Sequence, residues 1–388
     1  MKLEGITCLD LSLFLPGPTV TQIMADHGAR VIKIESLDTG EPNRHIGQTR
    51  DGESVYFTCT HRGKESLGLN LKDPRGLEIF MMLARQADVV VESFRPGVVK
   101  RLGVDYAAVR AVKPDIVYAA ISAYGQSGPL VADPAHDLAV EAMCGLLSNN
   151  VDGNNHPVMP AMPSGDMLAA TLTLCGILMA LLRRKDTGQG DYLDVAMMDS
   201  ILACMPNSMG AAFAEKQPPV PKNERIWGGN ALYRIYETSD GGHIALGGSE
   251  IKFARNLLTA LERPDLISLC EHPPGPDQLP VVAFLEQTFA SRTRAEWEVF
   301  FDGLDVCFAP VNDLRTGLDL PQTVHREMCL TDADGREHLG TPLKFSAEPA
   351  TLDLKAPGHG EQTRAILAEI GYDQRQIETL QAQGVVQG

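Results

Sequence analysis

Three positions along the chain carry titratable side chains where they could do chemistry. His136 and Asp137 stand in a loop after a predicted strand, and Asp166 stands just before a long apolar run. Glu250 follows a glycine-rich strand end. An imidazole and a carboxylate that flank one carbon atom could remove a proton and return one, and a carboxylate alone could act as a nucleophile. Each position also has a simpler interpretation, as a loop histidine bonded to the backbone, a helix N-cap, or a glutamate in a first helical turn.

The apolar run after Asp166, residues 167–182, predicts a long helix. Ser164 and Asp166 are suited to cap the free N–H groups at its start, and the cations at 183–185 follow at its negative end. Apolar side chains on every face predict a helix that is buried all round. The run falls short of the roughly 20 apolar residues of a membrane span, so we do not expect one. Burial and the helix dipole are expected to move the pKa of Asp166 in opposite directions.

The elements that must position these residues alternate between strand and helix in the first half of the chain. A strand, a helix closed by glycine and a second strand form a βαβ unit, which begins a parallel sheet covered by helices. The predicted strands are 6–11, 30–35, 67–71, 88–94 and 115–125. We therefore predict an α/β fold with a Rossmann-like parallel sheet, whose ligands lie in the loops after the strands. The first turn lacks GxGxxG, so no dinucleotide site is predicted.

The sequence pattern of the chain changes after about residue 200. Residues 1–200 are predicted to form the large α/β domain, and 201–224 a connector rich in proline. Residues 225–325, with a hairpin signal and three helical stretches, are predicted to form a smaller α+β domain. Residues 326–388 contain too little core to stand alone, so we expect this return segment to pack on the large domain.

The composition of the chain limits the kinds of partner that it is expected to bind. The 388 residues carry a formal net charge of −16, which argues against nucleic acid or an anionic membrane as a partner. Eight cysteines are scattered without a CxxC pair or a Cys/His cluster, so we expect reduced thiols and no metal site. The start of the chain lacks the pattern of a signal peptide. We therefore expect a cytoplasmic protein.

Several separated stretches, in order, resemble the family III CoA-transferases, the carnitine/bile-acid-inducible group that includes formyl-CoA transferases and α-methylacyl-CoA racemases. The resemblance covers essentially the whole chain. The stretches are LDLSLFLPGPTVTQIMADHGARVIKIE, LNLKDPRG, ESFRPGVVKRLGV, ISAYGQSGP, SGDM with GILMALLRRKDTGQGDYLDVAMMDS, and APGHGEQTRAILAEIGYD.

The resemblance implies catalytic roles for three residues. Asp166 matches the catalytic aspartate that precedes the long helix in this family. The racemase branch is more similar still, because His136 matches its catalytic histidine and Glu250 the glutamate that partners it. Leu15 stands where formyl-CoA transferases carry an active-site glutamine. The chain departs from the pattern at Ala135, where glycine is usual, and at Ser36, where an arginine near CoA is common in both branches.

The resemblance also implies how substrate is bound. Coenzyme A would lie along the large domain as part of the substrate, and no permanently bound cofactor is implied. A homodimer of interlocked chains is implied, in which each site lies between one subunit's large domain and the other's small domain. The residues matched to CoA contacts are Lys72, Ser93, Phe94, Arg95, Arg101 and Asp137.

Two reactions fit these residue types. Epimerisation of a 2-methyl-branched or related acyl-CoA thioester needs two acid–base groups flanking the α carbon, and His136 and Asp166 could fill those roles with Glu250 orienting the imidazole. The alternative is transfer of CoA between acids, in which Asp166 forms a mixed anhydride and then a thioester with CoA. A third alternative is a CoA-binding protein without catalytic activity.

Overall fold

The computed structural model describes all 388 residues, which form two compact units. The first unit contains residues 1–144, 161–204 and 321–388, and the second contains 145–160 and 205–320. The expected large domain, 1–200, included residues 145–160, which the structure groups with the second unit.

A seven-stranded sheet forms the centre of the first unit, in the order β14-β5-β2-β1-β6-β7-β8. All neighbours pair in parallel except β14, which pairs with β5 in the antiparallel sense. Because β1, β2, β5, β6, β7 and β8 are the first to sixth of the parallel strands, their order is 3-2-1-4-5-6. This is the doubly wound order of Rossmann-like folds, as predicted. The bounds are β1 Thr7–Asp10, β2 Arg30–Glu35, β5 Glu65–Leu69, β6 Val89–Glu92, β7 Val117–Ser122, β8 Asp191–Ala196 and β14 Val386–Gln387.

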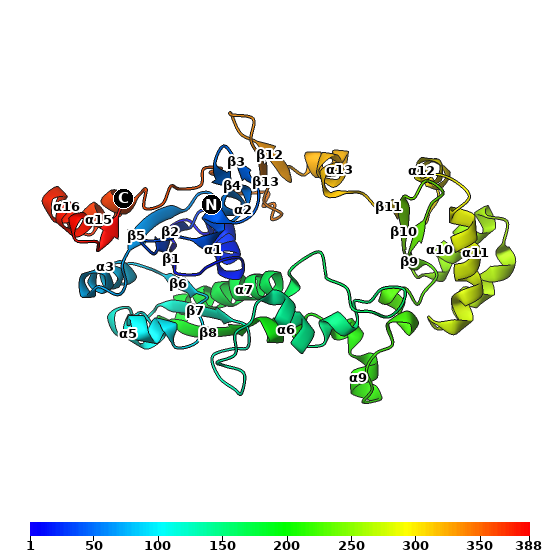
Figure 1. Cartoon of the computed structure of the whole chain (residues 1–388), viewed down its shortest axis with the longest axis horizontal. Helices are drawn as coiled ribbons and strands as arrows, with labels where there is room; N and C mark the ends of the chain where they lie inside the picture. The colour runs from blue at the N-terminus through cyan, green and yellow to red at the C-terminus, as the bar shows by residue number, and fades with distance from the viewer. The chain divides into compact units, whose positions relative to one another are not determined.

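Helices cover both faces of this sheet (Figure 1). Every residue of β6 is buried, as expected for a strand covered on two sides. One face is covered by α3 (Pro74–Ala84), α5 (Tyr106–Val112), α15 (Thr363–Glu369) and α16 (Gln374–Ala382). The other face is covered by α1 (Pro16–Asp26) and α7 (Ser164–Thr187), and α7 also packs against α6 (Asp137–Met143) and α8 (Met197–Ala203).

The predicted burial of the long helix on all sides is wrong for this chain. One side of α7 packs on α1, β7 and β8, and Ala169, Ile177 and Leu181 are buried there. On the opposite side Met179 and Leu182 are 69% and 68% exposed. The apolar side chains of α7 therefore extend over more of the helix surface than the rest of the chain covers. By length and composition alone, α7 is also a helix that could cross a membrane.

Short helices and hairpins connect the larger elements of the first unit. A short helix α2 (Val55–His61) follows a hairpin of β3 (Thr49–Arg50) and β4 (Glu53–Ser54), and α4 (Val98–Leu102) follows β6. A second hairpin joins β12 (Cys329–Thr331) to β13 (Glu337–Leu339), and α14 (Pro321–His325) precedes it.

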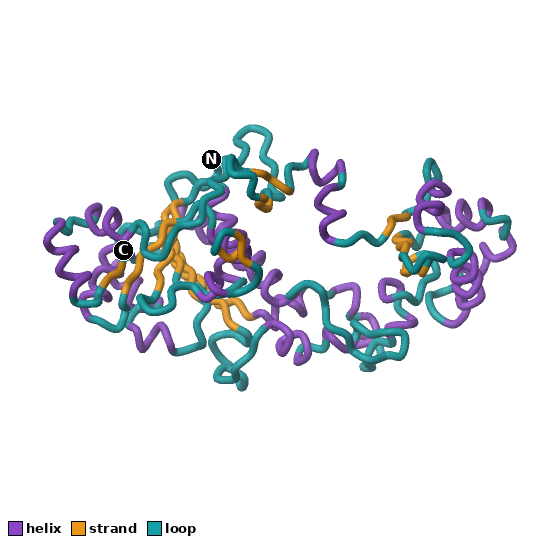
Figure 2. Tube along the Cα trace, turned by 45° about the horizontal axis from the view of Figure 1, so that its top comes forward, coloured by secondary structure: helices purple, strands orange, loops and turns teal.

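The second unit is built on a three-stranded antiparallel sheet in the order β11-β10-β9, and the tube in Figure 2 traces its strands and helices. Trp297 is fully buried in its core. The bounds are β9 Tyr233–Glu237, β10 His243–Gly247, β11 Phe308–Pro310, α9 Gly210–Ala214, α10 Ile251–Ala260, α11 Leu279–Phe289, α12 Arg294–Phe301 and α13 Leu314–Asp319.

Candidate active site

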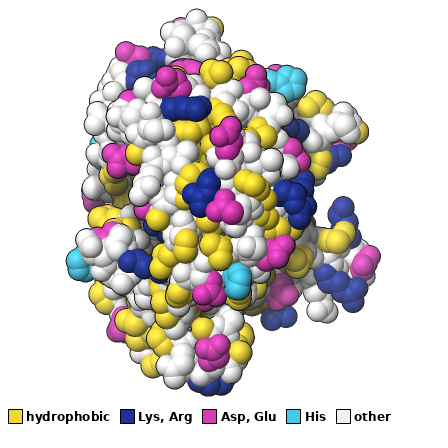
Figure 3. Space-filling model, turned by 90° about the vertical axis from the view of Figure 1, so that its right-hand side faces the viewer, with side chains coloured by type: hydrophobic (Ala, Val, Ile, Leu, Met, Phe, Trp, Pro, Cys, Tyr) yellow, Lys and Arg dark blue, Asp and Glu magenta, His cyan; other side chains and the backbone are white.

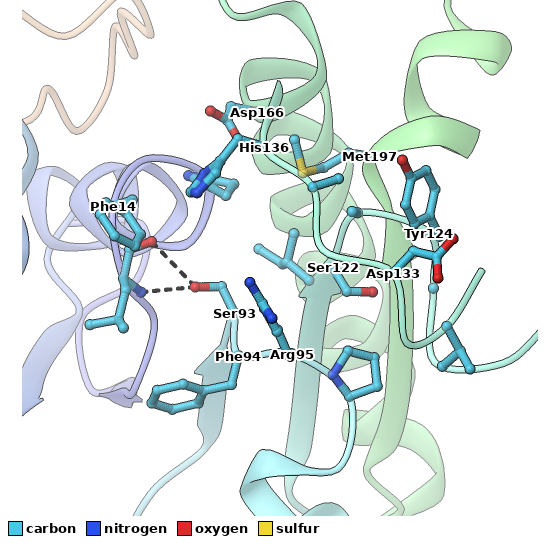
Figure 4. A pocket seen from close by; sticks show the side chains of 18 of the residues that line it. Phe14, Ser93, Phe94, Arg95, Ser122, Tyr124, Asp133, His136, Asp166 and Met197 are labelled. Carbon is cyan, nitrogen blue, oxygen red and sulfur yellow. Dashed lines mark hydrogen bonds between the residues drawn. The ribbon is translucent and has the colours of Figure 1, made fainter. Parts of the chain in front are cut away.

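The loops that follow β1 and β6 meet where the order of the sheet reverses. The N–H of Leu13 donates to the Ser93 hydroxyl at 2.8 Å, which ties the two loops together. A cavity of about 330 Å³ opens beside this contact (Figure 4). In doubly wound sheets, ligands bind at this switch point. Its lining includes Phe14, Ser93, Phe94, Arg95, Tyr124, Asp133, His136, Asp166 and Met197.

Asp166 reaches this cavity from the first turn of α7. The helix begins at Ser164 after Pro163, so Asp166 is the third helical residue and not the N-cap. No hydrogen bond from the chain reaches its carboxylate. The N–H groups of Ser164 and Asp166 instead donate to carboxylates of α6, Glu141 at 3.0 Å and Asp137 at 3.0 Å. Asp166 is therefore free to face the cavity, because two other acids satisfy the helix start.

The environment of Asp166 favours its protonated form. Burial, followed by the charges of Asp137 and Glu141, raises its pKa to about 7. The positive end of the α7 dipole would lower this pKa, but the two carboxylates of α6 already bond to it. A carboxyl group that titrates near neutral pH is suited to give and take protons under physiological conditions.

His136 stands at the start of α6 and lies beside Asp166 at the same end of the cavity (Figure 4). Its side chain makes no capping bond to the helix. The ring of Phe14 approaches the imidazole edge-on, with centroids 5.8 Å apart and planes at 90°. The imidazole is thus held by ring packing, and its nitrogens are free to meet a substrate.

The backbone of Phe14 is fixed in an uncommon conformation. Its φ of 64° lies in the left-handed region, which is unfavourable for a bulky residue. Its N–H donates to Glu41 at 2.9 Å, and its carbonyl accepts from the Asn43 amide. Glu41 is fully buried with Lys33 at 2.9 Å. A buried charged network therefore holds the loop that aims the Phe14 ring at His136.

A second cavity of about 770 Å³ adjoins the first. Leu13, Phe94 and Val98 line both, so the two spaces meet at these side chains. Two cations, Lys72 and Arg101, line the second cavity, and neither forms an ion pair within the chain. The remaining lining includes Glu35, Ser36, Asp38, Asn70 and Gly384.

The predicted site residues are thus divided among several places. Asp166, His136, Ser93, Phe94 and Arg95 line the first cavity, whereas Lys72, Phe94 and Arg101 line the second.

Two predicted site residues line neither cavity. Asp137 bonds to the start of α7, and its predicted contact with CoA stays a prediction. Glu250 lies on the second unit, exposed just before α10, and its approach to His136 also stays a prediction.

Three residues at this site were not found from the sequence. Glu141 and Phe14 act through contacts between elements that the pattern does not show, although Glu141 stands one helical turn after Asp137, a spacing that places both on one face. Tyr56 on α2 also lies near Asp166. Burial, then the charge of Asp166, raises the pKa of Tyr56 to about 12, which keeps this phenol neutral.

Comparison with known proteins agrees with this architecture. Residues 3–363 match the family described as CoA-transferase family III. The succinyl-CoA:glutarate CoA-transferase of Mus musculus is 30% identical over 99% of this chain and 90% of its own length. The α-methylacyl-CoA racemase of Homo sapiens is 30% identical over 100% of this chain and 98% of its own.

A CAIB/BAIF family protein from Brucella suis has a similar structure, with a TM-score of 0.82 and 26% identity. The match covers 95% of this chain and 99% of that chain. A succinyl-CoA transferase and an α-methylacyl-CoA racemase are thus both among the relatives. The match over residues 3–363 and the two relatives that are 30% identical show that this chain, with its doubly wound sheet, belongs to the CoA-transferase family III.

Proposed function

We propose that the protein epimerises 2-methyl-branched or related acyl-CoA thioesters by moving a proton at the α carbon. One observation carries the proposal: His136 and Asp166 line the same cavity at the switch point of the sheet. Inversion needs a base on one side of the carbon and an acid on the other. One group removes the α proton to leave an enolate, and the other returns a proton to the opposite face.

The thioester would enter by way of the second cavity. Unpaired Lys72 and Arg101 suit the phosphate groups of CoA, and the shared lining at Phe94 leads from there toward Asp166. Ser36 supplies no charge there, so we expect these two cations to carry the electrostatic part of CoA binding.

The test is α-proton exchange in D₂O with each enantiomer of a 2-methylacyl-CoA. The intact enzyme should introduce deuterium into both enantiomers and interconvert them without an added acid. His136→Asn removes one acid–base group, so interconversion should fall at least about 100-fold, while one enantiomer still exchanges through Asp166. Loss of exchange from both enantiomers in this variant, or no exchange by the intact enzyme across several acyl chains, would contradict two-base epimerisation.

CoA transfer is the second candidate, favoured by the Asp166 carboxylate, which faces the cavity without a hydrogen bond from the chain. In this reaction Asp166 attacks the thioester carbonyl to form a mixed anhydride and release CoA thiolate. The thiolate then attacks the aspartyl carbonyl, which yields aspartyl-CoA and frees the first acid. An acceptor carboxylate attacks aspartyl-CoA to form a second mixed anhydride and release the thiolate. The thiolate finally attacks the acceptor carbonyl, which forms the new acyl-CoA and restores the Asp166 carboxylate.

The two candidate reactions differ in whether a covalent intermediate can be trapped. A transferase should be inactivated by hydroxylamine only when acyl-CoA is present, with the adduct at Asp166, and His136→Asn should leave this inactivation intact. Deuterium exchange without trapping selects the epimerase, and trapping without exchange selects the transferase.

We further propose a cytoplasmic homodimer in which Glu250 of a second copy approaches His136 and fixes its tautomer. The exposed apolar side of α7 supports an association, because exposed apolar patches mark interaction surfaces. No disulfide bond joins any of the eight cysteines, which suits a reducing compartment.

A further inference from the structure

Glu141 is a buried acid that the reaction does not use directly. The residue is 0% exposed on α6, and its Oε1 accepts the Ser164 N–H at 3.0 Å. Its second oxygen, Oε2, is buried and has no hydrogen-bond donor. An ionised carboxylate with one oxygen left bare in such a place would be costly, whereas a protonated one could donate from that oxygen.

The charges around Glu141 are all negative. Asp137 stands one turn earlier on α6, and Asp166 faces the pair from α7. Asp199, the one titratable residue of the neighbouring α8, is exposed. No lysine or arginine forms an ion pair with Asp137, Glu141 or Asp166, and the imidazole of His136 at the start of α6 lies toward the cavity. Nothing nearby would balance three ionised carboxylates.

We propose that Glu141 is protonated in the working enzyme and donates its proton to Asp137, so that the two form a singly charged clamp that positions Asp166. Burial favours the neutral form of Glu141 because it raises the pKa of this carboxyl group. The hydrogen bonds from Ser164 oppose this shift, and the charge of Asp137 and its hydrogen bond to Glu141 add to it. Glu141 is thus a positioning residue, and it acts through the start of α7.

The clamp explains the state of the Asp166 carboxylate. The pair occupies the N–H groups of Ser164 and Asp166 with only one negative charge. Asp166 then receives no N–H donor from its own helix. With Glu141 neutral, burial and the charge of Asp137, the two larger causes, still raise the pKa of Asp166. Gly165 lies between the two donors, and a Cβ there would stand 3.0 Å from Asp137 Oδ1, so glycine allows the close approach of α6.

The inference rests on the proposed function only for its kinetic consequence, and a titration tests it separately. Carbon-13 NMR of the full chain, with labelled aspartate and glutamate carboxyl groups, follows Asp166, whose signal disappears in Asp166→Asn. Glu141→Gln keeps an acceptor for Ser164 and a donor for Asp137. If Glu141 is already neutral, this variant should titrate at Asp166 with the midpoint of the natural protein.

If Glu141 is ionised, Glu141→Gln removes a negative charge, and the Asp166 midpoint should fall by about one pH unit or more. That fall would overturn the proposal. Asp137→Asn is the positive control, because it removes the one charge that the clamp carries and should lower the midpoint in either case. These readouts hold whichever reaction the enzyme catalyses.

Glu141→Leu tests the positioning role, because leucine cannot accept the Ser164 N–H. We expect kcat to fall at least about tenfold with KM nearly unchanged, whereas Glu141→Gln stays within a few-fold of the natural enzyme. Equal activity of the leucine and glutamine variants would contradict positioning by the clamp. If the leucine variant does not fold, the titration of Glu141→Gln still decides the protonation state.

Discussion

At the scale of single residues, the site is defined by which carboxylate is left without a partner. Other acids, such as Asp73 and Asp105, cap the starts of helices in this chain. Asp166 instead faces a cavity, while Asp137 and Glu141 accept the N–H groups at the start of its helix. Its chemistry follows from this division, because each neighbour accepts one N–H of the α7 start and the Asp166 carboxylate is left with a raised pKa.

The pH dependence of exchange should report this carboxylate. Asp166 must be ionised to remove a proton, and its pKa is raised to about 7. The exchange rate for the enantiomer that uses Asp166 as base should therefore rise with pH and level off above about 7. The measurement is kcat/KM for deuterium incorporation between pH 5 and 9. A rise in kcat/KM near pH 4, the range of an ordinary aspartate, would show that these neighbours do not set the pKa of Asp166.

At the scale of elements, much of the first unit could be predicted from local pattern. The strand Arg30–Glu35 has the predicted bounds, because the apolar alternation and the preceding glycine define it. The hairpin at 233–247 and helix α10 were predicted from turn and periodicity signals. Strand β8 was missed, since Asp191 and Asp194 interrupt its apolar pattern and its place depends on pairing with β7.

The site was only partly accessible from the sequence. Asp166 stood out at the junction of a loop and an apolar helix, and the resemblance assigned His136. The roles of Glu141 and Phe14 depend on packing of α6 against α7 and on a left-handed loop residue, which local pattern does not reveal.

Gly165→Ala separates the helix propensity of residue 165 from its role in the close packing of α6 against α7. Alanine in place of glycine inside a helix usually stabilises it by up to about 1 kcal/mol. Here the new Cβ would lie 3.0 Å from Asp137 Oδ1 and 3.2 Å from Ile201, so α6 must move back from α7. We expect about tenfold or greater loss of kcat with little change in thermal stability. Gly176→Ala, in the same helix, faces only the Leu193 side chain, at 3.2 Å, and serves as the control.

Glu92 at the end of β6 should make stability depend on pH. It is 1% exposed and accepts the Phe94 N–H at 2.8 Å. Burial, and to a lesser degree the charge of Asp194, raises its pKa to about 8, compared with 4.5 when unperturbed. Between these two values the folded chain keeps a proton that the unfolded chain has lost. Stability due to Glu92 is therefore full below pH 4.5 and is lost as pH rises through 8.

Glu92→Gln keeps the acceptor for Phe94 and removes this titration. Denaturant unfolding at pH 5, 6, 7 and 8 should show the free energy of unfolding falling less steeply in the variant, by about 1.4 kcal/mol per pH unit in that window. Equal slopes for the two proteins would show that Glu92 is ionised when folded.

At the scale of the whole molecule, the surface combines a strongly acidic total with local apolar exposure. Acidic and basic side chains are interspersed with apolar ones over the face shown in Figure 3. The net charge of −16 keeps copies apart at long range, so an association must be driven by apolar contact.

The exposed side of α7 is where we expect that contact. In the proposed homodimer, Met179→Glu with Leu182→Glu should shift the association toward monomer in sedimentation equilibrium, because each charge would be buried unpaired. Val299→Glu, at a 77% exposed position on α12, is the control for an added charge alone. An unchanged dimer in the α7 variant would place the interface elsewhere.

The antiparallel strand β14 has a consequence for handling the protein. Its pairing with β5, Val386 to Leu69 and Gln387 to Gly68, covers the C-terminal end of the outer side of β5, and Gln362 and Thr363 bond to backbone groups nearer its start. A chain truncated before Val385 would leave the C-terminal end of β5 open, and an open strand edge recruits strands of other molecules. Such a truncation should therefore make the protein aggregate through intermolecular β-sheet, even though no residue that lines the cavity at Asp166 is lost.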